Sequence, residues 1–217
     1  MANITDVLLQ TKGGNGKRPQ KIMVFDVAAE TGGALSVLQD FYDELKHRSD
    51  LGDVQFFFVL STIELPETRN IHVLRFPWVK KGWGHRFFFD HIIAPRLVAQ
   101  YNIDTVFSLQ NLTIPHTRIP QVVFLHQALP FSEHRFGFFE NTLFWTYQNI
   151  IGKMILKSIR NAETVIVQTQ WMKRECIKQT GENEEKIAVI APALSFKPTT
   201  FFQPDPQSFL TFFYPAT

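Results

Sequence analysis

The sequence predicts an α/β domain with a mostly parallel sheet that is covered by helices on both faces. Short runs of apolar residues alternate along the chain with segments in which apolar residues recur every three or four positions. This alternation is typical of strand–helix–strand units, and uniformly apolar runs are typical of parallel strands that are buried on both faces. The chain has 217 residues, enough for one such domain, or for one domain and the start of another.

The first part of the chain predicts three strands and one helix. The first strand is expected at residues 21–27, and a turn through Gly32-Gly33 follows it. The helix after this turn is predicted from apolar residues at helical spacing: Leu35, Leu38, Phe41, Tyr42 and Leu45. The next two strands are expected at residues 54–60 and 71–76, because these apolar runs flank a polar turn that contains proline.

The middle of the chain predicts a helix and two short strands. The helix is expected at residues 87–101, where Pro95 should either kink it or mark its true start. Strands are expected at residues 105–109 and 121–125. Residues 110–120 between them carry two prolines and predict a loop.

The last third predicts a long apolar-rich helix at residues 137–160, followed by a strand at 164–168. A helix at residues 171–180 and a strand at 187–190 complete the series. The helix lengths and the strand spacing are again those of strand–helix–strand units.

Three regions are expected along the chain. Residues 1–20 are polar and rich in glycine near their end, so they predict a loose N-terminal tail. Residues 21–194 form the α/β domain. Residues 195–217 predict a Pro-rich linker and then a new strand at 209–214, which is either the first strand of a missing second domain or an added edge strand of the same sheet. We favour the first alternative.

The composition excludes several classes of protein. Hydrophobic residues make up 45% and charged residues 19%, a globular and not a disordered balance. A net charge of +2 is too small to favour a nucleic-acid partner. A single cysteine, Cys176, excludes an intramolecular disulfide and suits a reducing compartment. There is no signal-peptide pattern and no apolar run near the roughly 20 residues of a membrane span, so we expect a cytoplasmic protein.

Phenylalanine is frequent, with 22 residues that often stand in runs such as 56–58 and 87–89. Such runs fit either strands buried on both faces or apolar surface that contacts a partner. Aromatic and basic residues are mixed at 80–87 and 136–160. These segments could lie on the inner surface of a membrane, with cations at anionic headgroups. The alternative, a buried helix with cations near its C-terminus, is favoured because a largely apolar helix is usually buried.

Polar residues follow several of the predicted strands where each strand ends. The loops after Val27, Leu109, Leu125 and Gln168 should meet at one edge, because the carboxyl ends of parallel strands lie together and open α/β sheets bind ligands there. Gly32 and Gly33 follow the first strand. Glycine lets a ligand approach the backbone, and the helix N-terminus behind the turn offers free N–H groups to phosphate. A plain turn explains two glycines equally well.

Histidine and amide side chains occupy the other loops. His126 and Gln127 directly follow the strand at 121–125, so the imidazole could bind a substrate hydroxyl or stabilise a leaving phosphate. A histidine that bonds a neighbouring loop carbonyl is the equally weighted alternative. Gln110 and Asn111 supply amides that suit the recognition of sugar hydroxyls.

The loop after the strand at 164–168 supplies a hydroxyl and an amide, from Thr169 and Gln170, beside the aromatic ring of Trp171. An aromatic side chain can pack on the apolar face of a sugar, and the polar side chains can bond its hydroxyls. Thr169 also has the position of a helix cap. The sequence offers no metal-ligand spacing, no paired carboxylates and no nucleophile triad.

The combined motifs resemble the N-terminal domain of glycosyltransferase family 4 enzymes, which have the two-domain GT-B fold with a Rossmann-like first half. Four segments carry the resemblance: residues 21–34, residues 108–111, residues 123–127, and residues 162–172 together with 186–190. The segment at 212–216 resembles the opening of the family's donor domain. Glu30-Thr31 before the glycines and Ala34 after them depart from the family's common form.

The resemblance implies retaining transfer of a sugar from a nucleotide diphosphate donor to a glycan or lipid-linked acceptor, with no further cofactor. It implies that Gly32 and Gly33 lie near the donor phosphates and that His126 contacts the transferred sugar. The family's cationic pair for the diphosphate and its two glutamates belong to the second domain. Two other functions remain open: a non-catalytic α/β ligand-binding module, and an oxidoreductase, which the missing dinucleotide fingerprint disfavours.

Overall fold

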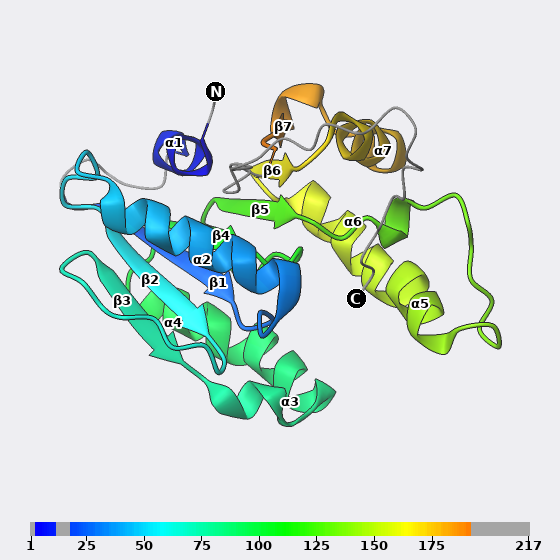
Figure 1. The fold of residues 1–217 in the computed structure, drawn as a ribbon, viewed down its shortest axis with the longest axis horizontal. Coiled ribbons are helices and arrows are strands. Elements are labelled where there is room, and N and C mark those ends of the chain that lie inside the picture. Colours follow the sequence, from blue (N-terminus) through cyan, green and yellow to red (C-terminus); the bar gives the residue numbers. More distant parts are fainter. Residues whose placement is uncertain (1–2, 12–17, 192–217) are drawn as a thin grey trace, which may run out of the picture.

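The protein has one seven-stranded, entirely parallel sheet with the strand order β3-β2-β1-β4-β5-β6-β7 (Figure 1). A computed structural model describes residues 3–11 and 18–191. The strands are β1 Lys21–Asp26, β2 Gln55–Leu60, β3 Ile71–Arg75, β4 Thr105–Ser108, β5 Gln121–Leu125, β6 Thr164–Val167 and β7 Ile187–Val189. The end of each strand lies within one residue of its predicted position, so the predicted α/β fold with a parallel sheet is confirmed. This is the Rossmann-like strand order.

Helices cover both faces of the sheet (Figure 1). The α-helices are α1 Ile4–Gln10, α2 Gly32–His47, α3 Trp83–Phe88, α4 Ala94–Gln100, α5 Thr142–Thr146, α6 Gly152–Asn161 and α7 Gln170–Thr180. The apolar sides of α1 and α2 pack on one face, while α4, α6 and α7 pack on the other. Short 3-10 turns lie at η1 Pro77–Lys81, η3 Leu129–Phe131 and η5 Glu184–Lys186.

The central strands alternate their side chains between these two cores. Phe56 and Phe58 pack against α2, whereas Phe57 points to the opposite core, and all three are buried. The phenylalanine run in β2 therefore belongs to a strand buried on both faces, as predicted. In the second run Phe89 is buried while Phe87 and Phe88 are exposed, so this run does not belong to a strand buried on both faces.

Two predicted helices are interrupted by π-helical turns. In the first, η2 Phe89–Ile93 joins α3 to α4, and the Ala94 N–H donates to the Phe89 carbonyl. Pro95 follows directly and lacks the N–H group that a regular helical turn needs. This explains why the pattern of backbone hydrogen bonds along the helix changes there. The second predicted helix begins at Thr142 and not at Gly137, because the Asn141 side chain caps it, and η4 Tyr147–Ile151 then joins α5 to α6.

The prediction of a loose tail over residues 1–20 is wrong for α1. Leu8 of this helix is fully buried in the core beneath α2, and Asp6 pairs with Arg48 at 3.0 Å. Apolar residues at helical spacing (Ile4, Val7 and Leu8) were the missed signal. The predicted linker and strand at 195–217 lie outside the described residues. Within the described part of the chain, no helix is both long and apolar enough to cross a bilayer.

Candidate functional site

The polar loops meet at the carboxyl edge of the sheet, between β1 and β4. The chain leaves β1 toward β2 and leaves β4 toward β5, in opposite directions, so this edge contains a topological switch point. Register places Phe25 opposite Ser108, and Ser108 opposite Val123. The residues that follow these strands therefore stand side by side, at the place where open α/β sheets bind ligands.

Asn111 joins the loops after β4 and β5. Its side-chain carbonyl accepts the backbone N–H groups of His126 at 2.8 Å and Gln127 at 3.1 Å. Its amide group lies 3.2 Å from His126 Nε2. The Asn111 backbone is left-handed with φ +64°, a conformation that asparagine tolerates better than most residues. The structure thus brings Asn111, His126 and Gln127 together, and Asn111 sets the shape of the loop that carries the histidine.

The contact with Asn111 fixes the proton on the His126 ring. Because the Asn111 oxygen accepts two N–H groups, its nitrogen is the donor toward His126 Nε2, which must accept. Burial lowers the pKa of His126, so the neutral ring is favoured at physiological pH. A neutral imidazole that accepts at Nε2 carries its proton on Nδ1. Nδ1 is buried and has no partner among the described residues, so this N–H is an unpaired donor.

We expect Asn111→Ala to lower the free energy of unfolding by about 2 kcal/mol, because it removes the acceptor of two backbone N–H groups and puts alanine at φ +64°. Asn111→Gly is the matched control, since glycine adopts this φ without strain. It should be more stable than the alanine variant by about 1 kcal/mol. Urea unfolding of the two variants measures the difference; equal stabilities would show that the backbone relaxes.

The glycine turn opens α2 as predicted. Gly32 has φ +66°, which favours glycine, and a Cβ added at Gly32 or Gly33 would meet nothing within 4 Å. The Thr31 side chain makes no capping hydrogen bond, so the first N–H groups of this 16-residue helix have no side-chain acceptor from Thr31. Lys80 ties the preceding loop to η1 through the Ala28 carbonyl at 2.9 Å. The helix start is therefore accessible and held in place, as phosphate binding requires.

The prediction from sequence missed a buried carboxyl group at the same edge. Asp26 ends β1, is 1% exposed, and accepts the Ala29 N–H at 3.0 Å through one oxygen, while its other oxygen has no partner among the described residues. Burial raises the pKa of Asp26 to about 6, although backbone N–H groups and the nearby charges of Arg86 and Lys80 oppose the rise. The signal was available in the sequence, since a carboxylate that ends an apolar strand is unusual.

Further buried polar atoms surround Asp26. Arg86, whose charge acts on Asp26, pairs with Asp90 at 2.8 Å, and burial raises the pKa of Asp90 while Arg86 opposes the rise. The second oxygen of Asp90 and the side-chain oxygen of buried Gln110 have no partner among the described residues. Together with Asp26, His126 and Ser61, which directly follows β2, five side chains at this edge have a buried polar atom without a partner among the described residues. A buried polar atom without a hydrogen-bond partner lowers the stability of a folded protein unless a ligand or a water molecule binds it.

Thr169 and Gln170 stand apart from this group. Both are exposed at the start of α7, and the Thr169 hydroxyl accepts the Met172 N–H at 3.1 Å, so Thr169 is the helix cap. The neighbouring Trp171 lines a hollow of about 510 Å³ together with residues of the loop after β5, including Phe131 and His134. Trp171 therefore borders a hollow at this edge, whereas neither Thr169 nor Gln170 lines it.

We expect Thr169→Ala to destabilise the domain by about 1 kcal/mol, the usual effect of a lost N-cap, and Thr169→Ser to keep the capping bond and the stability. Thermal unfolding of the two variants measures this effect. If Thr169 serves only as a cap, ligand binding per folded molecule is the same in both. Weaker binding by a fully folded alanine variant would instead assign the hydroxyl to a substrate.

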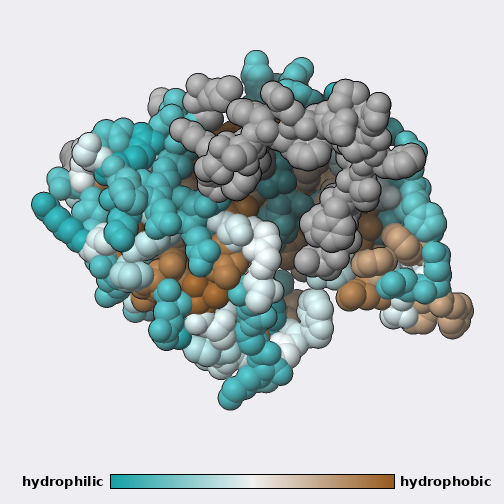
Figure 2. Space-filling model, viewed as in Figure 1, coloured by the Kyte–Doolittle hydropathy of each residue, from teal (hydrophilic) through white to brown (hydrophobic). Residues whose placement is uncertain are grey.

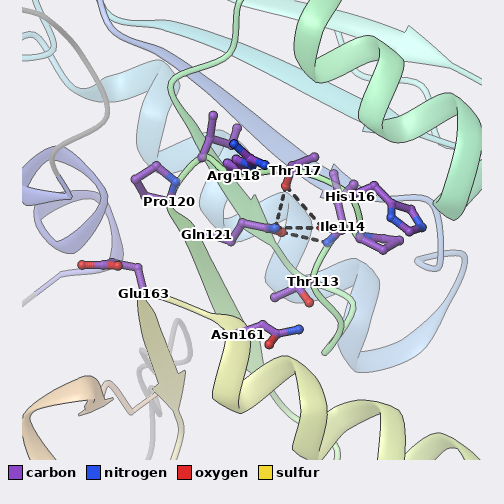
Figure 3. A pocket seen from close by; sticks show the side chains of 11 residues that line it. Thr113, Ile114, His116, Thr117, Arg118, Pro120, Gln121, Asn161 and Glu163 are labelled. Atoms are coloured by element: carbon purple, nitrogen blue, oxygen red, sulfur yellow. Dashed lines mark hydrogen bonds between the residues drawn. The ribbon is translucent and has the colours of Figure 1, made fainter.

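A second hollow, of about 440 Å³, lies at the opposite edge of the sheet (Figure 3). It is lined by the loop before β5 and by Glu163 just before β6, so it faces the amino ends of the strands. The Gln121 amide donates to the Ile114 carbonyl at 2.8 Å and to the Thr117 hydroxyl at 2.9 Å, and its oxygen accepts the Ile114 N–H at 2.8 Å. These contacts satisfy Gln121 and hold the loop, which gives the group a structural role.

No group of three or more His, Cys, Asp or Glu side chains within residues 3–11 and 18–191 is arranged to hold a metal ion. The unpaired atoms of the carboxyl edge instead offer hydrogen-bond acceptors (Asp26, Asp90 and Gln110) beside two donors, His126 Nδ1 and the Ser61 hydroxyl. Such a mixed set suits hydroxyl groups, which donate and accept.

Comparison with known proteins gives one family. The chain matches the model of Glycosyltransferase Family 4 over residues 31–195, a span that runs from the start of α2 past β7. No curated protein sequence matches the chain. A solved glycosyltransferase from Rickettsia africae ESF-5 is similar with a TM-score of 0.42 and 13% sequence identity, over 83% of this chain and 47% of that one. The chain thus spans about half the length of that protein. Since the family match covers well over half of its residues, the chain belongs to Glycosyltransferase Family 4.

Proposed function

We propose that this chain is the acceptor-side domain of a retaining glycosyltransferase, which transfers a sugar from a nucleotide diphosphate to a glycan or lipid-linked acceptor. Family membership supports the reaction class. The observation that carries the assignment of the site is the set of five unpaired buried polar atoms along the carboxyl edge that contains the switch point between β1 and β4. The donor sugar is a substrate, and the proposal includes no other cofactor.

In this proposal the N-terminus of α2 faces the diphosphate. The N–H groups behind Gly32 and Gly33 have no side-chain cap from Thr31, and the helix dipole favours negative charge there. The charge that develops on the diphosphate as the sugar leaves would be stabilised by donors that need not reorganise. The family resemblance places the remaining phosphate ligands on a second α/β domain, so we propose that transfer requires both domains.

His126 would donate its Nδ1–H to a hydroxyl of the transferred sugar. The neutral ring offers a directed donor without adding positive charge, and Asn111 holds it by the opposite nitrogen. Gln110, Gln127 and the Trp171 hollow would bind the remaining sugar hydroxyls and an apolar sugar face. The buried thiol of Cys176 is consistent with a reducing, cytoplasmic location.

The test is sugar transfer from a panel of nucleotide diphosphate sugars to glycan and lipid-linked acceptors. It should be run with this chain and with the product of the complete reading frame that encodes it. We expect transfer with retained anomeric configuration by a product that holds a second domain, and none by the 217-residue chain alone. Robust transfer by this chain would contradict the two-domain requirement, and an inverted product would contradict the retaining mechanism.

A further inference from the structure

The segment from the turn before α5 to the end of α6 has a dense group of exposed apolar side chains. Phe139 is 99% exposed in the turn, and Leu143, Ile150 and Met154 are exposed along the helical segment that follows. We call this surface the α5 face and define it by Phe138, Phe139, Leu143, Phe144, Ile150 and Met154, with Lys153 and Lys157 beside them. Figure 2 shows apolar side chains gathered where Figure 1 places α5.

The C-terminal part of the α5 face is a stripe along the helix. Ile150, Met154 and Lys157 follow one another at helical spacing, while the opposite side of α6, including Ile155 and Ile159, is buried against the sheet. The favoured prediction of a buried helix is therefore wrong for this side. A largely exposed group of this size, with bulky aromatic residues, indicates a contact surface.

The charges beside the α5 face are mostly positive. Residues 138–162 contain three cations, Lys153, Lys157 and Arg160, and one carboxylate, Glu140, which lies 3.4 Å from the ring of His134. All three cations are exposed, and none has a carboxylate partner among the described residues. A second copy of this chain docking by the same face would bring like charges together, which disfavours self-association. An anionic surface is the complementary partner.

A second surface of the same composition lies on α3. Trp83 is 75% exposed, Phe87 and Phe88 are exposed one turn further on, and Lys81 and His85 are exposed beside them. Asp90 is the single carboxylate of residues 77–100, and it is paired with Arg86. Because α3 follows β3 and α5 follows β5 in an all-parallel sheet, both surfaces project from the carboxyl edge, on the side of the candidate site (Figure 1).

We infer that the α5 face docks on an anionic lipid bilayer, with Phe139 and Leu143 inserted at the interface and Lys153 and Lys157 at the headgroups. Aromatic and aliphatic side chains flanked by lysines, with Glu140 as the single carboxylate of residues 138–162, have the chemistry of an interfacial anchor. Each lysine near an anionic surface adds attraction, and apolar insertion adds a component that salt does not screen. The α3 surface would reinforce this contact. The inference does not depend on sugar transfer.

The test is sedimentation of the 217-residue chain with vesicles of phosphatidylcholine, with or without phosphatidylglycerol. We expect binding only to the vesicles that contain phosphatidylglycerol. The double variant Lys153→Glu, Lys157→Glu should reduce the partition coefficient by roughly tenfold or more. The matched control is Lys46→Glu, Lys178→Glu, which changes the net charge equally with exposed residues of α2 and α7, and it should bind much more like the wild type.

Two further variants separate lipid insertion from other contacts. Phe139→Ser and Leu143→Ser should weaken the binding that persists at high salt while the circular dichroism spectrum stays unchanged, because both side chains are exposed. Equal loss of binding in the two lysine double variants would overturn the inference, since attraction would then depend on net charge alone. Absence of vesicle binding, or serine variants that change only the oligomeric state, would overturn it as well and assign the face to a protein contact.

Discussion

The Asp26→Asn variant should gain roughly 3 kcal/mol of stability relative to the wild type as the pH rises from about 4 to about 7. The folded protein holds the Asp26 proton up to a pKa of about 6, whereas the unfolded chain releases it near 3.8. Between these values the folded state binds more protons, so a rise in pH favours unfolding of the wild type. A shift of about two pKa units corresponds to about 3 kcal/mol, and asparagine does not titrate.

The measurement is the difference in urea unfolding free energy between the two proteins across this pH range. The asparagine side chain would keep an oxygen for the Ala29 N–H, so the loop after β1 should survive the change. Asp53→Asn removes an exposed carboxyl group and serves as the control for the loss of one surface charge. A difference that stays constant with pH would show that Asp26 is not desolvated, and the electrostatic description of the edge would then be wrong.

Replacement of His126 should affect the reaction far more than the fold. His126→Ala, made in a transfer-competent form of the protein, should lower kcat/KM roughly a hundredfold, because removal of one preorganised donor has about this effect in other enzymes. The free energy of unfolding should fall by about 1 kcal/mol, since the ring is only half-buried and the loss is the single hydrogen bond from the Asn111 amide to Nε2.

His126→Phe is the matched variant, because it keeps an aromatic ring against Phe124 but offers no donor. It should be as stable as the wild type and as slow as His126→Ala. If either variant melts far lower while its folded fraction turns over normally, the ring serves the fold and the chemistry lies elsewhere. A phenylalanine variant with normal kcat/KM would show that the N–H is not used.

The strands were predictable because burial on both faces leaves an unambiguous signal: an apolar run of limited length between polar turns. The interruptions of the helices were harder to predict. Pro95 marked the start of a helix, since α4 begins at Ala94, but the π-turn that precedes it was not predicted. The α1 helix was missed although Ile4, Val7 and Leu8 have helical spacing, because the segment is short and is followed by polar residues. That its apolar side packs on a core formed by residues far along the chain, such as Phe124 and Ile166, is visible only in the structure.

The position of the candidate site could be predicted from the sequence, but the burial and the hydrogen bonds of its side chains could not. Parallel strands bring their carboxyl ends together, so His126, Asn111 and the glycine turn could be assigned to one edge from sequence alone. The register of the strands and the burial of each side chain could not be read from the sequence. The structure shows that Asp26 is buried and that the charge of Arg86 lowers the pKa of Asp26. It also shows that Asn111 sets the tautomer of His126, and that Thr169 belongs to a helix cap.

The most direct test of the central claim is an amide chemical-shift titration of this chain with nucleotide diphosphate sugars, a method that detects weak binding. The claim is that the carboxyl edge between β1 and β4 binds the substrates. It predicts shifts at Gly32, Gly33, Asn111, His126 and Gln127, and an unchanged amino edge around Ile114 and Glu163. Shifts confined to the amino-edge hollow, with the glycine turn and His126 unaffected, would contradict it.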